Sequence, residues 1–172
     1  MNKIELRKFL KYMKIENHQK NLQEKYLLLA LWDFINVNKP SCIGLFAAIE
    51  NEVDLIPIFK MAQENGIATA YPSINGDEIT FHSIESLQML NEKAFGICAP
   101  AKTLPAIVPD LLIVPGLAFT KNGKRLGRGK GHYDRYLGQH KCKTVSLAFS
   151  WMLLDDLPTE PHDVRIDKVI DC

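Results

Sequence analysis

Residues 110–137, DLLIVPGLAFTKNGKRLGRGKGHYDRYL, run from an apolar stretch through a glycine-rich basic loop into a segment with helical spacing. The apolar stretch at 110–115 predicts a buried strand that ends at Pro115 and Gly116. The segment HYDRYLGQ, residues 132–139, predicts a helix that begins directly after the glycines. Strand, loop and helix in this order are typical of an α/β fold, whose ligands bind beyond the carboxyl ends of strands.

The chain on either side of this stretch alternates between the same two kinds of element. We expect further strands at 41–49, 67–74, 78–84 and 143–153, with 78–84 as an edge strand or hairpin arm. We expect further helices at 3–14, 17–34, 52–66 and 85–96. The apolar face of the helix at 17–34 is assigned to Leu22, Tyr26, Leu29, Ala30 and Phe34. The alternation predicts an α/β fold with a mostly parallel sheet.

Composition narrows the class of protein. A chain of 172 residues with 47% hydrophobic residues suits one domain with a proper core. A net charge of +1 gives no overall attraction to nucleic acid or to an anionic membrane. The four cysteines are far apart, which argues against a zinc site. The N-terminal residues have neither the apolar core nor the cleavage site of a signal peptide, and no stretch approaches the length of a membrane span. We therefore expect a cytoplasmic protein with reduced thiols.

Positive charge is concentrated in the loop. Residues 121–135 carry six basic side chains and one acidic side chain, a net charge of +5, within a chain of net charge +1. Gly127, Gly129 and Gly131 permit positive φ angles, and successive backbone N–H groups there can bind an anion together with a helix N-terminus. The spacing matches neither a Walker loop nor GxGxxG. Two interpretations remain open, a polyphosphate site and a solvated flexible loop.

The order of residues across 110–137 resembles the signature of the 5-formyltetrahydrofolate cyclo-ligase family, also called 5,10-methenyltetrahydrofolate synthetases. The resemblance implies a three-layer α/β/α sandwich with a mixed, mostly parallel sheet, as a single domain over residues 1–172. It implies conversion of 5-formyltetrahydrofolate to 5,10-methenyltetrahydrofolate, with ATP as co-substrate and Mg²⁺ as cofactor. It also leads us to expect a monomer that binds folate and ATP but neither nucleic acid nor membrane.

The resemblance also assigns candidate site residues. Those for catalysis are Arg128, Lys130 and Tyr133. Those for ATP are Lys3, Arg7, Arg125, Gly127, Arg128, Gly129, Lys130, Gly131, His132, Tyr133 and Asp134. Those for the folate are Phe46, Glu52, Phe95 and Tyr133, and those for the metal are Asp134 and Asp163. Without the resemblance, the same residues would be assigned to a solvated basic helix face, a helix-start carboxylate, core aromatics and a surface aspartate.

The chain departs from the family pattern at several positions. His132 stands where the family usually has a second aromatic residue, and Phe95 stands near a position that is often tryptophan. Two alternatives to the cyclo-ligase function follow. One is a diverged member of the family that binds ATP but has lost folate turnover. The other is a nucleic-acid-binding module built on the basic loop, which would require stacking aromatics and a wider basic face.

Overall fold

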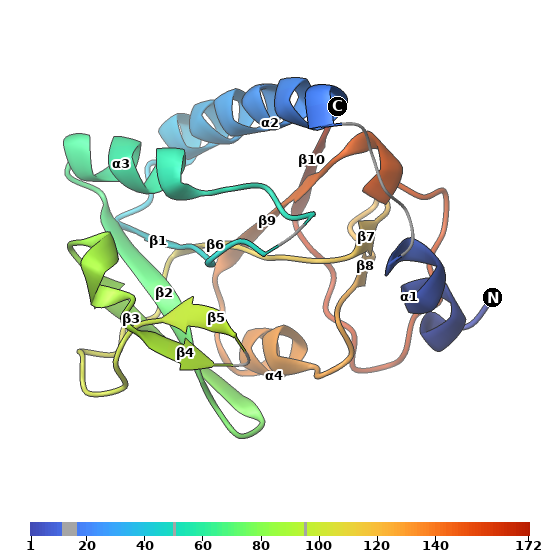
Figure 1. Cartoon of the computed structure of the whole chain (residues 1–172). Coiled ribbons are helices and arrows are strands. Elements are labelled where there is room, and N and C mark those ends of the chain that lie inside the picture. The colour runs from blue at the N-terminus through green and yellow to red at the C-terminus, as the bar shows by residue number, and fades with distance from the viewer. Residues whose placement is uncertain (12–16, 50, 95) are drawn as a thin grey trace.

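The computed structural model describes residues 1–11, 17–49, 51–94 and 96–172. Its centre is a six-stranded sheet in the order β10-β9-β6-β1-β2-β3 (Figure 1). The strands are β1 (Cys42–Gly44), β2 (Ala68–Asn75), β3 (Glu78–Ile84), β6 (Leu111–Ile113), β9 (Lys143–Ala148) and β10 (Lys168–Asp171). Neighbours pair in parallel except β2 and β3, which are antiparallel. The expected mixed, mostly parallel sheet is confirmed, with β3 at its edge as predicted.

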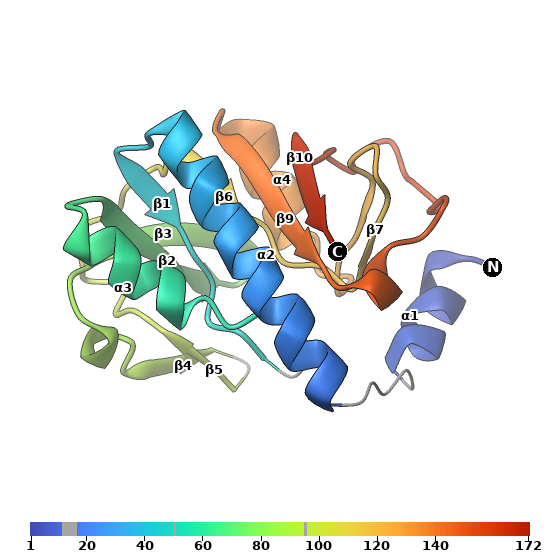
Figure 2. The ribbon, with the colours of Figure 1, turned by 90° about the horizontal axis from the view of Figure 1, so that it is seen from above.

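Helices cover both faces of the sheet. Helices α2 (Asn17–Asn38) and α3 (Ile56–Glu64) pack on one face, and α4 (His132–Gln139) lies on the other. Seen from above, α2 runs diagonally across the sheet, while α1 (Lys3–Lys11) stands at the β10 end (Figure 2). The core between the layers includes Leu31, Ile43 and Leu112, each fully buried. This arrangement is the expected three-layer sandwich.

The apolar face of α2 differs from the prediction. Its buried residues are Leu27, Leu31 and Ile35, which lie one turn apart. The side chains of Leu22, Tyr26 and Leu29 are 57%, 55% and 66% exposed, so their assignment to the buried face was wrong. Ala30 and Phe34 are partly buried and border the core, as expected. The segment from 27 to 31 is apolar at every position, so its spacing alone could not select one face.

Several predicted boundaries were also wrong. The expected helix at 85–96 is a short 3₁₀ turn, η1 (Leu87–Met89), followed by the hairpin of β4 (Glu92–Ala94) and β5 (Ile97–Ala99). The strand expected at 143–153 ends at Ala148 and is followed by η2 (Ser150–Met152). The strand expected at 41–49 is regular only over β1. Part of the helix expected at 3–14 lies outside the described residues.

A second hairpin, which the sequence reading missed, lies between β6 and the glycine-rich loop. It consists of β7 (Ala118–Phe119) and β8 (Arg125–Leu126). A small second core holds α1 against this hairpin, through Leu6, Ala118, Leu126 and Leu157. This packing brings the N-terminal helix to the glycine-rich loop, although more than a hundred residues separate them. Among the described residues, no helix is both long enough and apolar enough to cross a bilayer.

Candidate active site

The glycine-rich loop, residues 127–131, joins β8 to the start of α4. Gly129 has φ +102° and Gly131 has φ +68°, backbone angles that residues other than glycine rarely adopt. Gly131 precedes the first residue of α4, so the free N–H groups of the first helical turn lie at the end of the loop. The helix predicted at 132–139 begins and ends where the sequence placed it. The local geometry is that of an anion-binding loop before a helix N-terminus.

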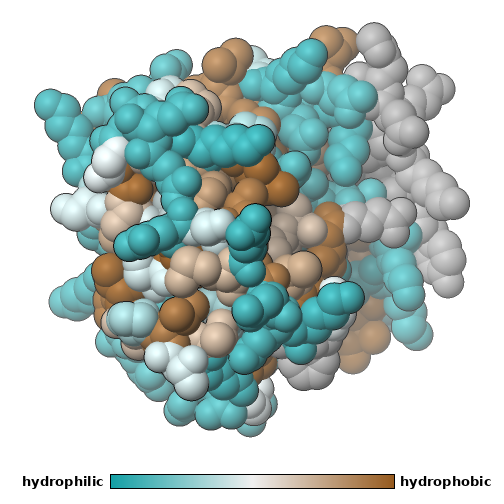
Figure 3. All heavy atoms as spheres, turned by 60° about the vertical axis from the view of Figure 1, so that its left-hand side comes forward, coloured by the Kyte–Doolittle hydropathy of each residue, from teal (hydrophilic) through white to brown (hydrophobic). Residues whose placement is uncertain are grey.

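A cavity of about 300 Å³ lies against this loop. Its apolar wall comes from Phe46, Pro72, Ile74, Ile79 and Ile97, which belong to three separate parts of the chain. On the face shown in Figure 3, hydrophobic side chains are interspersed with hydrophilic ones. Lys3, Glu52 and Arg128 line the cavity together with the apolar residues, so it has the mixed lining that is typical of a small-molecule site.

The predicted site residues come together around this one cavity. It is lined by Lys3, Arg7, Phe46, Glu52, Arg125, Gly127, Arg128, Gly129, Lys130, Gly131, His132, Tyr133, Asp134 and Asp163. The remaining candidate, Phe95, lies outside the described residues. The structure thus brings α1, the loop before α3, the glycine-rich loop and the 160s segment to a common site.

Lys3 is held by two carboxylates. Its Nζ lies 2.6 Å from Asp163 Oδ2, 2.8 Å from Asp163 Oδ1 and 2.7 Å from Glu160 Oε2. Burial by itself would lower the pKa of Lys3, but the hydrogen bonds with the two carboxylates outweigh it and raise the pKa. Burial likewise opposes ionisation of Asp163, yet its hydrogen bond with Lys3 leaves its pKa below the ordinary value. The ammonium and both carboxylates are therefore charged near neutral pH.

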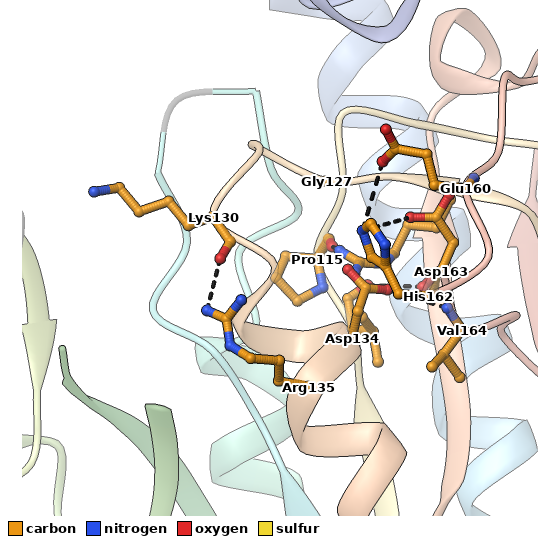
Figure 4. Close-up of polar contacts among 12 residues, drawn as sticks. Pro115, Gly127, Lys130, Asp134, Arg135, Glu160, His162, Asp163 and Val164 are labelled. Carbon is orange, nitrogen blue, oxygen red and sulfur yellow. Dashed lines mark hydrogen bonds and ion pairs between the residues drawn. The ribbon is translucent and has the colours of Figure 1, made fainter. Parts of the chain in front are cut away.

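Arg125 and Asp134 form a mostly buried ion pair beneath the loop. Arg125 Nη2 donates to Asp134 Oδ2 at 2.9 Å, and the two side chains are 5% and 15% exposed. Arg125 Nη1 also donates to the carbonyl of Pro115, and the backbone N–H of Val164 donates to Asp134 Oδ1. Figure 4 shows Asp134 beside Val164 and the carboxylate cluster. Both residues thus have protein partners, so their role includes holding the loop in place.

Arg7 and Arg128 tie the loop to other parts of the site. Arg7 Nε donates to the carbonyl of Gly127 at 2.9 Å. Arg128 Nη2 donates to Glu52 Oε1 at 2.8 Å, and Glu52 Oε2 accepts the N–H of Ile49. The buried Glu52 therefore links the loop before α3 with the glycine-rich loop. A residue assigned to the phosphates and one assigned to the folate are direct neighbours.

Tyr133 lines the cavity beside Phe81 and Arg125. Its ring meets Phe81 edge-on at 6.3 Å between centroids, and the Arg125 guanidinium is 5.8 Å from the ring centroid. Burial raises the pKa of the Tyr133 hydroxyl, and the nearby Glu52 charge adds to that effect. The phenol is therefore neutral at physiological pH and serves as a hydrogen-bonding group or an apolar wall.

Besides four residues of the apolar wall, the sequence analysis missed Glu160 and His162, which line the cavity, and a third charged residue beside it. Glu160 and His162 stand with Asp163, with ligand atoms within 4.8 Å of one another (Figure 4). This set could hold a cation, as the Lys3 ammonium beside it indicates. The third charged residue is Arg135, whose Nη2 donates to the carbonyl of Lys130. The sequence signal available for Glu160 and His162 was the Glu-x-His-Asp cluster. For Arg135, a surface arginine on a short helix, the sequence offers no such signal.

Comparison with known proteins agrees with this geometry. Residues 1–171 match the 5-formyltetrahydrofolate cyclo-ligase family. A 5-formyltetrahydrofolate cyclo-ligase from Mus musculus is 32% identical over 145 residues, which cover 74% of this chain and 71% of the mouse chain. A 5,10-methenyltetrahydrofolate synthetase structure from Aquifex aeolicus has a TM-score of 0.86 at 30% identity, covering 99% of this chain and 90% of the other. One from Mycoplasma pneumoniae has a TM-score of 0.80 at 28% identity, covering 99% and 98%.

Proposed function

The chain belongs to the 5-formyltetrahydrofolate cyclo-ligase family, and we propose that it converts 5-formyltetrahydrofolate and ATP to 5,10-methenyltetrahydrofolate, ADP and phosphate. The observation that carries this proposal is a cavity in which a basic glycine-rich loop adjoins an apolar wall. A phosphate-binding loop alone would suit many enzymes. Its direct hydrogen bond to the buried Glu52 beside an apolar slot suits a reaction between a triphosphate and a flat, weakly polar ring.

The proposed reaction has two steps. The formyl oxygen attacks the γ-phosphorus, and the bond to ADP breaks, so the oxygen becomes part of a phosphate leaving group. N10 then attacks the formyl carbon, loses its proton, and phosphate departs as the five-membered ring closes. Phosphoryl transfer of this kind depends mainly on positioning and on stabilising charge. The site therefore needs cations around the transferred phosphoryl group and rigid walls around the folate.

We assign the phosphate end to α1 and the glycine-rich loop. Arg128, Lys130 and the loop N–H groups would stabilise charge on the transferred phosphoryl group. Lys3 and Arg7, one turn apart on α1, would bind the rest of the triphosphate, with Lys3 leaving its carboxylate partners to do so. Because Arg7 holds the carbonyl of Gly127, binding of ATP would engage α1 and the loop together.

The carboxylates fit a magnesium ion. Mg²⁺ prefers one or two carboxylates together with phosphate oxygens, and Asp163, Glu160 and Asp134 all lie near the loop. Asp163 is the better placed ligand, because its carboxylate already lies against a cation. Both carboxylate oxygens of Asp134 already accept hydrogen bonds, from Arg125 and from the N–H of Val164, and Asp134 would have to bind the metal while it keeps them. Bound Mg²⁺ would supply charge neutralisation for the phosphates.

We assign the folate end to Glu52 and the apolar wall. The carboxylate of Glu52 would accept hydrogen bonds from pterin nitrogens, while Phe46 packs against the ring. Tyr133 would stand between the formyl group and the phosphate. Phe95 stays a candidate wall residue. We further propose that residues 1–172 act as one domain and one monomer in the cytoplasm, with neither nucleic acid nor membrane as a partner.

An assay with purified protein tests the function against its alternatives. ATP- and Mg²⁺-dependent growth of methenyl absorbance in the near ultraviolet, starting from 5-formyltetrahydrofolate, is the expected result. Saturable ATP binding without product would instead identify a diverged relative. Retention on a DNA column that falls with salt, in a protein without ATP binding, would favour the nucleic-acid module.

A further inference from the structure

We propose that Arg135, assisted by His132, is a positioning residue that holds the tip of the β2–β3 hairpin against the glycine-rich loop. In this way it sets the separation between the folate wall and the phosphate end of the cavity. The inference rests on the proposed function and deepens it, because it concerns how the two substrates are aligned with each other. Arg135 itself is not among the residues that line the cavity.

The contacts of Arg135 join two segments that are far apart in sequence. Its Nε and Nη2 donate to the carbonyl of Asp77 at 2.9 and 2.7 Å, at the turn between β2 and β3. The same Nη2 donates to the carbonyl of Lys130 at 2.7 Å, as Figure 4 shows. His132, in the same helical turn, places its Nε2 3.1 Å from the carbonyl of Gly76. Two side chains of α4 thus hold two successive carbonyls of the hairpin tip.

The hairpin matters because it forms one wall of the cavity. Pro72 and Ile74 on β2 and Ile79 on β3 line the cavity close to the turn. Strand β3 ends the six-stranded sheet and pairs there with β2 alone, so that sheet fixes the tip from one side only. The bonds from α4 supply a second attachment. Movement of the tip would therefore shift the apolar wall relative to the phosphate-binding groups.

The same contacts fix the shape of the loop. Gly131 has φ +68°, which favours glycine, and a Cβ built there would lie 2.8 Å from Arg135 Nη1, so the guanidinium packs closely against this residue. Holding the carbonyl of Lys130 also fixes the N–H of Gly131 on the opposite side of their shared planar peptide. Because both residues line the cavity, the orientation of this peptide determines which group the phosphate meets. Arg135 therefore acts on the loop and on the hairpin at once.

The partner on the hairpin is the backbone, not the carboxylate of Asp77. That carboxylate is 94% exposed and lies 4.0 Å from Arg135 Nη2. Exposed ion pairs of this kind contribute little. Asp77→Asn therefore keeps the proposed contact and serves as a matched control. A second control is Arg165→Gln, since Arg165 is exposed and makes one long hydrogen bond of 3.4 Å to the carbonyl of Asn122.

The kinetic test compares Arg135→Gln and Arg135→Lys with these controls. A misplaced reactant lowers the rate of the chemical step. We therefore expect kcat of Arg135→Gln to fall by about 10- to 100-fold. The Kd values for ATP alone and for 5-formyltetrahydrofolate alone should change much less than kcat does. Lysine should restore part of kcat, because it can donate to one of the carbonyls. A wild-type kcat in Arg135→Gln, or a loss confined to ATP affinity, would overturn the proposal.

Amide hydrogen exchange tests the contact without relying on turnover. Arg135→Gln should speed exchange in both residues 75–78 and residues 127–131, whereas Asp77→Asn should not. Unchanged exchange in both segments would show that Arg135 does not hold them together. If the wild-type protein made no methenyl product, the proposed function would fail, while this measurement would still decide whether the contact exists.

Discussion

Arg128 donates from Nη2 to Oε1 of Glu52 across 2.8 Å, joining positions that lie 76 residues apart in the chain. The Glu52 side chain is 8% exposed and that of Arg128 is 45% exposed, so the carboxylate is buried while the guanidinium still reaches the cavity. In this position the Arg128 guanidinium could donate to a phosphate oxygen in the cavity while it stays paired with Glu52, the residue that we assign to the folate. We propose that the pair lies where the two substrates meet.

Replacement of Arg128 should damage the chemical step. We expect Arg128→Ala to lower kcat by about 10²- to 10³-fold, the usual cost of losing one group that stabilises transition-state charge. Lys130→Ala should act in the same direction. Steady-state kinetics together with circular dichroism would measure both rate and fold, with Arg165→Gln as the arginine control. Near-wild-type rates in both variants would remove the loop from the phosphate site.

Replacement of Glu52 should affect the other substrate. Glu52→Gln keeps the size of the side chain but loses its charge, so the KM for 5-formyltetrahydrofolate should rise while the Kd for ATP changes little. Because Glu52 and Arg128 are in contact, the double variant should lose less than the sum of the two single losses. Additive losses in that cycle would mean that the pair does not act as a unit.

Asp134 gives a test of the metal site. Asp134→Asn removes a charge from beside Arg125, and we expect it to raise the Mg²⁺ concentration needed for half-maximal rate. A magnesium titration of initial rates would measure this. Asp156→Asn is the control, because Asp156 is 75% exposed and pairs with Lys124 instead. If the magnesium titration of Asp134→Asn matched wild type, Asp134 would be a partner of Arg125 and not a metal ligand.

The raised pKa values of buried and partly buried tyrosines and thiols predict a loss of stability in alkali. Burial raises the pKa of Tyr71, Tyr133 and Tyr136, and raises the pKa of Cys42 and Cys142 to about 11. The unfolded groups lose their protons at pH of about 8.5 for thiols and about 10 for tyrosines. The native state binds protons more tightly, so stability is full below these values and falls as pH rises above them. Urea midpoints measured across this range should decline, and a flat profile would contradict the burial of these groups.

Tyr136→Phe isolates one of these groups. The Tyr136 hydroxyl is buried and makes no hydrogen bond to any residue in the described part of the chain. Its ring packs against Phe81 and His140, contacts that phenylalanine would keep. We expect Tyr136→Phe to be neutral or to stabilise the protein by up to about 1 kcal/mol at neutral pH. It should also make the alkaline decline shallower. Destabilisation at neutral pH would show that the hydroxyl has a partner.

The sequence could predict the glycine-rich loop and the helix that follows it because their signals are local. Glycines end the loop, helical spacing begins at His132, and the helix follows as expected. For α2, every position from 27 to 31 is apolar, so the buried face depended on packing that the sequence does not display. The residues at 85–96 satisfied a helical pattern, but pairing of β4 with β5 decided their structure.

The members of the site could be assigned by resemblance, but their mutual contacts could not. Nothing in the sequence shows that Lys3 lies against Asp163, or that Arg128 lies against Glu52. The contact of Lys3 with Asp163 depends on the small core that holds α1 against the β7–β8 hairpin, and on where the chain places residues 160–163. The role of Arg135 could not be predicted either. Its partners are backbone carbonyls, which carry no sequence signal.

The most direct test of the account follows methenyl absorbance and phosphate release together in one reaction of the purified protein. With 5-formyltetrahydrofolate, ATP and Mg²⁺ present, we expect both products to form in equal amounts. We expect neither to form when ATP is replaced by an analogue whose γ-phosphate cannot be transferred. Phosphate release without methenyl product, or methenyl product without ATP, would contradict the claim that the loop activates the formyl oxygen by phosphorylation.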